Sequence, residues 1–264
     1  MVNDEAESWV AWRWRKRNGR GWLDPITRFN PVSLDDLQHI EPQKDELGRN
    51  TRQFLAGLPA NNALLWGPRG TGKSSLVKAL LIEYAARGLR LIEVDKGDLM
   101  DLPEIVELLE GRPERFILFC DDLSFEEGED AYKALKSVLD GSVSAMSDNV
   151  LIYATSNRRH LMPEYHDENL QARHVDGELH PGEAVEEKIS LSERFGLWVS
   201  FYPFSQDEYL DIVAYWLGSF GVAPAEIEAA RQEALQWALM RGSRSGRVAW
   251  QFARDHAGRL QEAV

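Results

Sequence analysis

A glycine-rich turn between an apolar run and a helical segment is the feature that most restricts the fold of this chain. The turn reads Gly67-Pro68-Arg69-Gly70-Thr71-Gly72-Lys73-Ser74-Ser75 and follows the pattern GxxxxGK[ST]. A strand-like run, Ala63 to Trp66, precedes it, and a helical run that Gly88 closes follows it. This spacing in this context predicts a loop that binds the phosphates of a nucleotide.

Each position of the loop has a mechanical role. The glycines permit backbone conformations that residues with a Cβ avoid, so that consecutive N–H groups converge on a phosphate. Lys73 would place its ammonium between the β- and γ-phosphates, and the Ser74 hydroxyl would ligate Mg²⁺. We expect the Lys73 side chain to be solvated when no nucleotide is bound. An accidental surface turn is the alternative, and the flanking strand and helix disfavour it.

Composition bounds the remaining possibilities. With 264 residues, 44% hydrophobic and 28% charged, the chain is long enough for one α/β domain and a smaller satellite. A net charge of −13 argues against a large nonspecific nucleic-acid surface, although a local patch stays open. Cys120 is the single cysteine, which excludes an intramolecular disulfide. Residues 1–8 lack an apolar leader and no later run reaches 18 apolar residues, so we expect a cytoplasmic protein without membrane insertion.

Residues 1–31 are interpreted as an N-terminal arm. Here four tryptophans alternate with basic side chains, namely Trp9, Trp12, Trp14 and Trp22 with Arg13, Arg15, Lys16, Arg17 and Arg20. Two interpretations are open: a basic and aromatic contact for nucleic acid or acidic lipid, or a semi-ordered arm whose indoles pack on the main domain. We favour the second, because arginines commonly stay solvated beside packed indoles.

Residues 32–204 alternate between helical and strand patterns, as a parallel sheet requires. Helices are expected near 42–58, 76–87, 103–110, 130–139 and 183–195, and strands near 63–66, 89–94, 116–120, 150–154 and 197–202. Five parallel strands alternating with helices predict a three-layer α/β domain. The polar stretch 160–181 contains His160, His166, His174 and His180, whose spacing matches no metal-ligand pattern, so we interpret them as solvated.

A helical lid domain is expected at residues 205–264. Pro203 marks the boundary, and Ser205 with Glu208 forms a capping box that opens the helix 206–218. Further helices are expected at 224–240 and 247–260, and no strand pattern follows Tyr202.

A second motif supplies carboxylates beside the phosphate loop. The apolar run Phe116 to Cys120 ends in Asp121 and Asp122, which is the pattern of a Walker B strand. Asp121 would hold Mg²⁺ with Ser74, and Asp122 would orient and deprotonate the attacking water, with Glu126 or Glu127 as substitutes. An ordinary strand that ends in an Asp-rich turn is the alternative.

Three further residues complete a possible hydrolytic site. Asn157 follows the strand 150–154 and could reach the water or the γ-phosphate through its amide. Arg194 lies at a helix end just before the fifth strand, and Arg247 lies in the first turn of the last helix. A surface ion pair of Arg194 with Glu193 or another local carboxylate is the simpler alternative.

Taken in order, these features resemble an AAA+ ATPase. The resemblance implies ATP and Mg²⁺ as cofactors, with Asn157 at sensor 1, Arg194 as the arginine finger and Arg247 at sensor 2. It also implies a head-to-tail homo-oligomer, expected to be a ring, in which Arg194 acts at the neighbour's nucleotide. Ile40 is the residue expected near adenine, although the surrounding segment lacks the glycine usual in the related pattern.

More narrowly, the stretches WGPRGTGKSSLVKALL, RFILFCDDLSFEEGEDAYKALKSVLDG and GSRSGRVAWQFARD resemble an uncharacterised bacterial AAA+ family catalogued as a domain of unknown function. The leading functional hypothesis is therefore an ATPase that remodels or switches a macromolecular partner. The alternatives are a nucleotide-bound scaffold with little or no turnover, a replication-initiator or helicase-loader type of protein, and a small-molecule P-loop kinase. Many AAA+ proteins have Asp-Glu where this chain has Asp121-Asp122, so slow turnover is expected.

Overall fold

The computed structural model describes residues 9–28, 32–125, 129–140, 148–159, 161, 173–175, 178–180 and 191–262. Among the predicted features, the greater part of the helix 183–195 lies outside these residues. So do His160, His166, Glu126 and Glu127. His174 and His180 fall in two short strands, β7 (Arg173–Val175) and β8 (Glu178–His180), of which only the backbone is described.

A seven-stranded sheet forms the centre of the molecule, with the order β2-β1-β4-β5-β6-β3-β9. All neighbours in it are parallel except β1 and β2. The five strands predicted from the sequence are present as β3 (Ala63–Trp66), β4 (Leu89–Glu93), β5 (Arg115–Cys120), β6 (Val150–Ser156) and β9 (Leu197–Ser200). The three-layer α/β class is confirmed, but the predicted number of five strands was wrong.

The two additional strands come from the segment that we interpreted as an arm. β1 (Ala11–Arg17) and β2 (Arg20–Pro25) form an antiparallel hairpin, and β1 pairs in parallel with β4. Trp14 is fully buried, and its indole Nε1 donates to Asp101 over 3.0 Å. The hairpin therefore extends the sheet, and Trp12 and Trp14 of β1 belong to the hydrophobic core.

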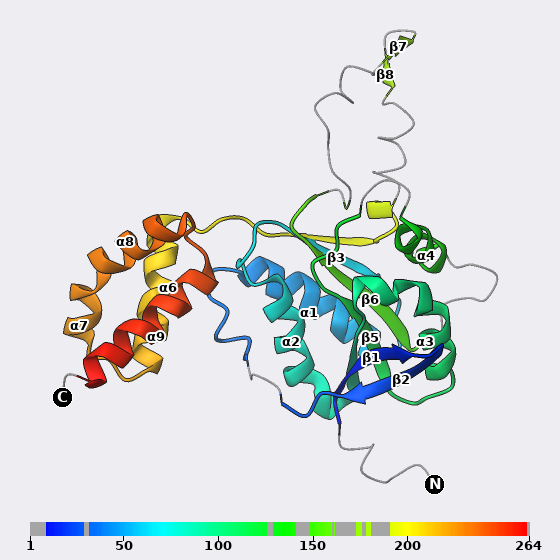
Figure 1. The fold of residues 1–264 in the computed structure, drawn as a ribbon, viewed down its shortest axis with the longest axis horizontal. Coiled ribbons are helices and arrows are strands. Elements are labelled where there is room, and N and C mark those ends of the chain that lie inside the picture. Colours follow the sequence, from blue (N-terminus) through cyan, green and yellow to red (C-terminus); the bar gives the residue numbers. More distant parts are fainter. Residues whose placement is uncertain are drawn as a thin grey trace.

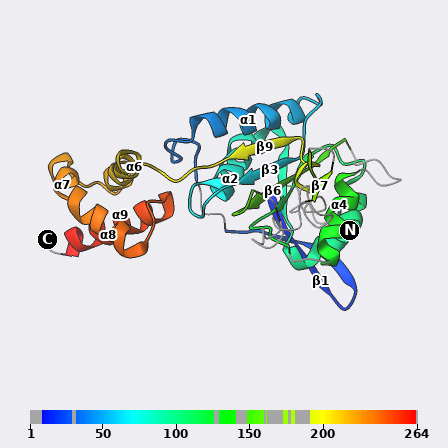
Figure 2. The ribbon, with the colours of Figure 1, turned by 90° about the horizontal axis from the view of Figure 1, so that it is seen from above.

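Helices cover both faces of the sheet, and the alternation of side chains along each strand assigns them to two hydrophobic clusters. On one face lie α1 (Glu41–Leu55) and α2 (Lys73–Tyr84), which pack against strand residues such as Leu65 and Phe119. On the other face lie α3 (Leu102–Leu109) and α4 (Asp130–Leu139), against residues such as Leu64 and Leu118. Figure 2 shows α1 and α4 on opposite sides of the strands.

After β9 the described chain is helical, with α6 (Gln206–Ser219), α7 (Pro224–Ala229), α8 (Arg231–Arg241) and α9 (Gly246–Glu262). These helices form a group beside the sheet, joined to it by the segment that follows β9 (Figure 1), and the segment before α1 contacts them through His39 and Asp36. The predicted capping box is present, because Ser205 Oγ accepts from the Glu208 N–H and the Glu208 carboxylate accepts from the Ser205 N–H. The single helix predicted for 224–240 is instead α7 and α8. The domain limits 32–204 and 205–264 remain a prediction.

Residues of the helical group join the same hydrophobic cluster as α1 and α2. Phe204, Tyr209 and Phe252 are buried in this cluster together with Ile40 and Phe201. Within the described part of the chain, no helix combines the length and the apolar character needed to cross a membrane.

Candidate functional site

The phosphate loop connects β3 to α2 at the carboxyl end of the sheet. Gly67 has a φ of 141°, and a Cβ there would lie 2.2 Å from the carbonyl oxygen of Phe201. Gly70 has a φ of 77°, and a Cβ there would lie 2.8 Å from Ser245 Oγ. Gly67 and Gly70 are therefore required both by backbone conformation and by the close approach of Phe201, after β9, and of Ser245, before α9. All nine predicted loop positions, from Gly67 to Ser75, lie in this turn and the first turn of α2.

Lys73 is enclosed by the loop that precedes it. Its side chain is buried, and its Nζ donates to the carbonyls of Gly67 (2.6 Å) and Pro68 (2.8 Å) and to Asn157 Oδ1 (3.3 Å). The expectation that Lys73 is solvated without nucleotide was wrong, because the loop folds around the ammonium and supplies its acceptors. Burial lowers the pKa of Lys73 to about 8, against the raising effect of Asp122 and Asp121.

Asp121 is positioned by two hydroxyl groups, one from a helix and one from a strand. Ser74 Oγ and Thr155 Oγ1 both donate to Asp121 Oδ1, each over 2.6 Å. Ser74 lies at the start of α2 and Thr155 near the end of β6, so three elements meet at one carboxylate oxygen. The structure thus brings together the two residues, Ser74 and Asp121, that the sequence assigned to Mg²⁺.

Asp122 lies in a left-handed backbone conformation, with a φ of 53°. Its N–H donates to Thr155 Oγ1 over 2.8 Å, and its Oδ1 accepts a hydrogen bond from Asn157 Nδ2. The Arg69 guanidinium lies 3.6 Å from the other carboxylate oxygen of Asp122, and both side chains are mostly exposed. Asn157 thus connects Lys73, through its Oδ1, to Asp122, through its Nδ2.

The helical group contacts the phosphate loop through the start of α9. A Cβ at Gly70 would lie 3.3 Å from Arg247 Cβ, and the Arg247 charge is one of those that lower the pKa of Lys73. Ile40 is buried immediately before α1, and its Cδ1 would lie 3.3 Å from a Cβ at Gly72. Arg247 and Ile40 therefore both lie near the loop, although they are far apart in the sequence.

Arg194 lies apart from this group and has a partner within the chain. Its Nε donates to Asp140 Oδ1, at the carboxyl end of α4. The ion pair that we considered as the simpler alternative is therefore present, although its partner is Asp140 and not Glu193. This contact leaves the proposed role of Arg194 at a neighbouring subunit untested.

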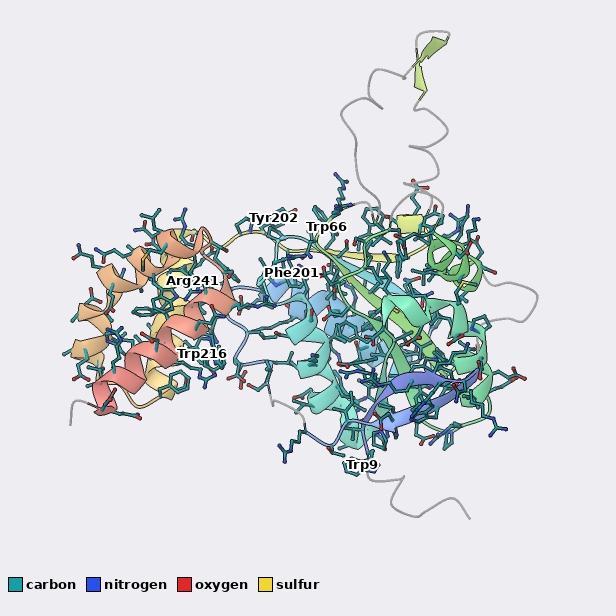
Figure 3. The ribbon with its side chains drawn as sticks, viewed as in Figure 1. Trp9, Trp66, Phe201, Tyr202, Trp216 and Arg241 are labelled. Atoms are coloured by element: carbon teal, nitrogen blue, oxygen red, sulfur yellow. The ribbon has the colours of Figure 1, made fainter. Side chains whose placement is uncertain are left out.

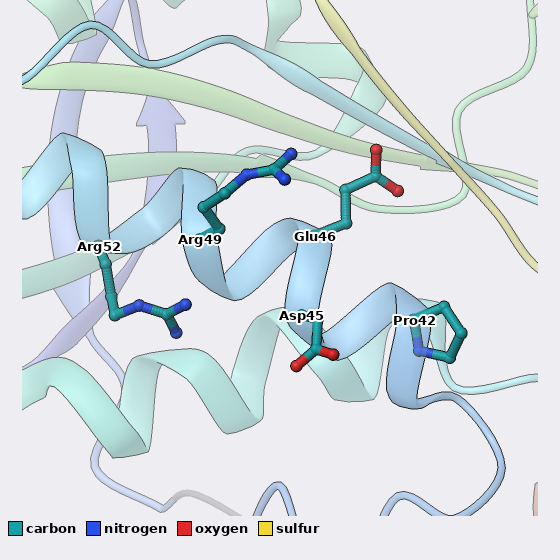
Figure 4. A pocket seen from close by; sticks show the side chains of 5 residues that line it. All are labelled: Pro42, Asp45, Glu46, Arg49 and Arg52. Atoms are coloured by element: carbon teal, nitrogen blue, oxygen red, sulfur yellow. The ribbon is translucent and has the colours of Figure 1, made fainter.

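Two further features are an aromatic pair next to the phosphate loop and a hollow on α1. Trp66 and Tyr202 lie edge to face with ring centroids 6.4 Å apart, beside the segment that leads to the helical group (Figure 3). A shallow hollow on α1 is lined by Pro42 and by side chains of both charges, namely Asp45, Glu46, Arg49 and Arg52 (Figure 4). None of the residues that line this hollow was predicted as a site residue.

Sequence reasoning missed two residues that shape the site. Thr155 holds both carboxylate positions, and Ser245 packs on Gly70 while its Oγ accepts from Val248 N–H at the start of α9. Thr155 lies two residues before Asn157 on a buried strand. Its only signal in the sequence was a hydroxyl side chain near the carboxyl end of that strand. Ser245 could have been found as the N-cap of the helix that carries Arg247.

A parallel sheet with this phosphate loop, two carboxylates at the end of a nearby strand and a helical group after the last strand define an AAA+ type of P-loop fold. The chain belongs to the family described as "Protein of unknown function (DUF815)", which matches residues 7–260.

Curated relatives are similar over shorter stretches. The Replication factor C large subunits of Sulfolobus acidocaldarius and Ignicoccus hospitalis are 32% and 36% identical over 86 and 75 residues. These stretches cover 32% and 28% of this chain but only 20% and 15% of the relatives.

Solved structures of two variants of Thermotoga maritima RuvB share the fold, with TM-scores of 0.54 and 0.57 at 17% and 18% identity. The matches cover 85% and 88% of this chain and 63% and 68% of RuvB. At this identity the likeness concerns the fold alone.

Proposed function

We propose that this protein binds ATP with Mg²⁺ and hydrolyses it at a site shared between subunits, and that the resulting motion of the helical group remodels or switches a macromolecular partner. The observation that carries the proposal is the position of Asn157, whose amide contacts both Lys73 of the phosphate loop and Asp122 after β5. A residue so placed can respond to the γ-phosphate and to the attacking water at once.

The residues present fit both cofactors. Ser74 and Asp121 offer a hydroxyl and a carboxylate oxygen 2.6 Å apart, and Mg²⁺ prefers such oxygen ligands. The loop offers a buried ammonium, and two of its glycines lie where a Cβ would clash with neighbouring groups. When bound, Mg²⁺ would neutralise charge on the phosphate oxygens.

The chain's own groups divide the work of hydrolysis. Lys73 would exchange the carbonyls of Gly67 and Pro68 for phosphate oxygens, which carry more negative charge. Asp122 would orient a water and accept its proton, while Asn157 holds the carboxylate in place. Arg247 would report the γ-phosphate to the helical group, because it lies against Gly70.

The shared site rests on Arg194, which lies just before β9 and outside the cluster of Lys73, Asp121 and Asp122. Within one subunit its guanidinium contacts Asp140 at the end of α4. In a head-to-tail ring each interface would bring one such guanidinium to the neighbour's nucleotide. There an arginine can contribute about 10³ to 10⁵ in rate.

Mixing two inactive variants tests this arrangement. Arg194→Ala retains Asp122, and Asp122→Asn retains Arg194, so a mixed assembly contains some interfaces with both groups intact. Recovery of ATPase activity on mixing supports the shared site. Failure to recover activity, in a preparation that light scattering shows to be co-assembled, rules the shared site out.

Asp140→Asn provides the matched control for Arg194. It removes the ion pair inside the subunit but keeps the guanidinium. If Arg194 serves only that ion pair, both variants lose the same activity. The shared site predicts that Asp140→Asn stays close to the wild type while Arg194→Ala loses turnover.

A nucleotide-bound switch with little turnover is the second candidate. It is favoured by the pairing of Arg69 with Asp122 and by the shorter aspartate at the position of the proposed base. Steady-state phosphate release from the wild type separates the two candidates, because a switch binds ATP without sustained release.

A role in DNA replication is a third candidate and rests on the similarity to Replication factor C large subunits. The net charge of −13 argues against a broad nucleic-acid surface. Binding of duplex or single-stranded DNA that falls steeply with salt would favour this role. The partner is otherwise best sought by capture on Asp122→Asn protein loaded with ATP, in the cytoplasmic fraction.

A further inference from the structure

Thr155 occupies a position from which one hydroxyl reaches both carboxylate residues. The side chain is buried, with 1% of its surface exposed. Its Oγ1 donates to Asp121 Oδ1 over 2.6 Å and accepts from the Asp122 N–H over 2.8 Å. A hydroxyl has one proton to donate, so its donor is fully used by Asp121.

The backbone of Thr155 adds a third contact to the same turn. Its carbonyl accepts from the Leu123 N–H over 2.7 Å. The turn Asp121 to Leu123 is thereby held against β6 at three successive residues. This matters because Asp122 has a φ of 53°, a conformation that costs free energy for a residue with a Cβ unless its surroundings hold it.

We propose that Thr155 is a positioning residue for the reaction, which presents Asp121 to Mg²⁺ and Asp122 to the attacking water in one fixed arrangement. This inference rests on the proposed ATP hydrolysis. Ser74 and Thr155 together hold Asp121 Oδ1 with two hydrogen bonds, which fix the orientation of this carboxylate relative to the cation or its water. Outer contacts of this kind orient a metal-binding carboxylate and affect metal affinity or activity by about 10- to 100-fold.

The adjacent Ser156 offers a matched control. Ser156 is also fully buried, and its Oγ donates over 2.7 Å to the Leu123 carbonyl, in the same turn. It contacts neither carboxylate side chain. Ser156→Ala therefore removes this hydrogen bond to the turn, and the one that Ser156 Oγ accepts from the Arg158 N–H, while both hydrogen bonds to Asp121 keep their donors.

The experiment compares Thr155→Val, which keeps the shape and removes the hydroxyl, with Thr155→Ser, which keeps the hydroxyl. Calorimetry measures ATP affinity with EDTA and across a magnesium titration, and phosphate release measures turnover. For Thr155→Val we expect Mg²⁺ to increase ATP affinity about 10-fold less than in the wild type, and turnover to be about 10- to 100-fold lower. The ATP affinity in EDTA should stay within a few-fold of the wild type. Thr155→Ser should recover most of both losses.

Ser156→Ala should lose thermal stability and keep the magnesium dependence of the wild type. If Thr155→Val does not fold, the comparison of Thr155→Ala with Thr155→Ser gives the same readout. Suppose that the wild type binds ATP with Mg²⁺ and hydrolyses it, but the valine, alanine and serine variants all show the same magnesium dependence. This result overturns the inference about Thr155 and leaves the proposed function standing. A wild type that shows neither binding nor turnover overturns the proposed function instead.

Discussion

The Nζ atom of Lys73 lies 3.3 Å from Oδ1 of Asn157, while Nδ2 of the same amide donates to Asp122. The phosphate loop and the two strands that carry the carboxylate and the amide are thus connected before a nucleotide binds. We expect a ligand that draws Lys73 away from Asn157 to alter the contact between Asn157 and Asp122 as well. One side chain would then couple ATP binding to the orientation of the proposed base.

Lys73→Met should abolish ATP binding, because the methionine keeps the apolar length of the side chain and lacks the charge. It also removes the Lys73 donor from the Gly67 carbonyl, whereas the Pro68 carbonyl keeps a hydrogen bond from Thr71 Oγ1, so we expect unfolding to become easier by about 1 to 3 kcal/mol. Calorimetry with ATP and a thermal melt measure the two effects. Unchanged ATP affinity in a folded variant would rule out the phosphate-loop assignment.

The affinity for ADP in EDTA should fall as the pH rises through about 8. Burial lowers the pKa of Lys73 to about 8, so the free protein carries this charge below that pH and loses it above. Binding of the ADP phosphates requires the charged form of Lys73, so above pH 8 binding must be accompanied by uptake of a proton. The affinity for ADP should therefore fall by up to about tenfold per pH unit. Titrations in buffers of different ionisation enthalpy measure this uptake.

Lys73→Arg is the control for the pH dependence, because a guanidinium stays charged over the whole range. An arginine variant that binds ADP with the same decline above pH 8 would assign the effect to another group. A flat profile in the wild type would contradict the lowered pKa.

Asp122→Asn should keep ATP affinity within a few-fold and lower turnover by about a hundredfold or more, the usual scale of lost general-base assistance. Asparagine can still fill the space between Asn157 and Arg69. Single-turnover phosphate release is the measurement. Normal hydrolysis in this variant would transfer the role to another carboxylate.

Arg247→Ala should remove the preference for ATP over ADP without abolishing binding of either. Arg247 lies against Gly70 at the start of α9, so it can report the γ-phosphate to the helical group. Competition between the two nucleotides measures the preference, with Arg244→Ala as a neighbouring exposed control. A preference that survives in Arg247→Ala argues against this role.

Gly21→Ala should destabilise the protein by about 1 to 3 kcal/mol, the typical cost of overpacking. A Cβ at Gly21 would lie 1.9 Å from Cζ2 of the buried Trp14 ring. Gly97→Ala is the control, because a Cβ there would meet nothing within 4 Å. Equal melting temperatures of the two variants would mean that the hairpin does not contribute to the cooperative core.

The central strands could be predicted because each carries a strong local signal. The runs at Phe116 to Cys120 and Val150 to Ala154 are continuously apolar, as strands covered on both faces must be. The capping box at Ser205 likewise defined the start of α6. In these cases local sequence and tertiary structure favour the same conformation.

The N-terminal hairpin was missed although its signal was present. Trp12, Arg13, Trp14 and Arg15 alternate with the period of a strand, and Asn18-Gly19 has positive φ at both positions, 53° and 75°, as a two-residue hairpin turn requires. The arginines instead favoured the interpretation of a semi-ordered arm with solvated basic side chains. Arg13 instead pairs with Glu93 at 2.6 Å, on the neighbouring strand β4.

The burial of Lys73 and the role of Thr155 could not be predicted from local pattern. Both depend on which strand lies beside which, and β6 neighbours β3 although 83 residues separate the end of one from the start of the other. A sequence motif identifies the side chains of a site, whereas strand order determines which of these side chains lie close enough to form hydrogen bonds with one another.

Strand order also has a consequence for biosynthesis. β3, which leads into the phosphate loop, is flanked by β6 and β9, so the ribosome must extend the chain to residue 156 before β3 gains its first partner. Its second partner arrives only with residues 197–200. The two strand pairings of β3 join segments that are far apart in the sequence, so they form slowly because closing a long loop costs chain entropy. The phosphate loop is thus completed late, and a nascent chain can first use cellular nucleotide as a folding ligand when most of its length has been made.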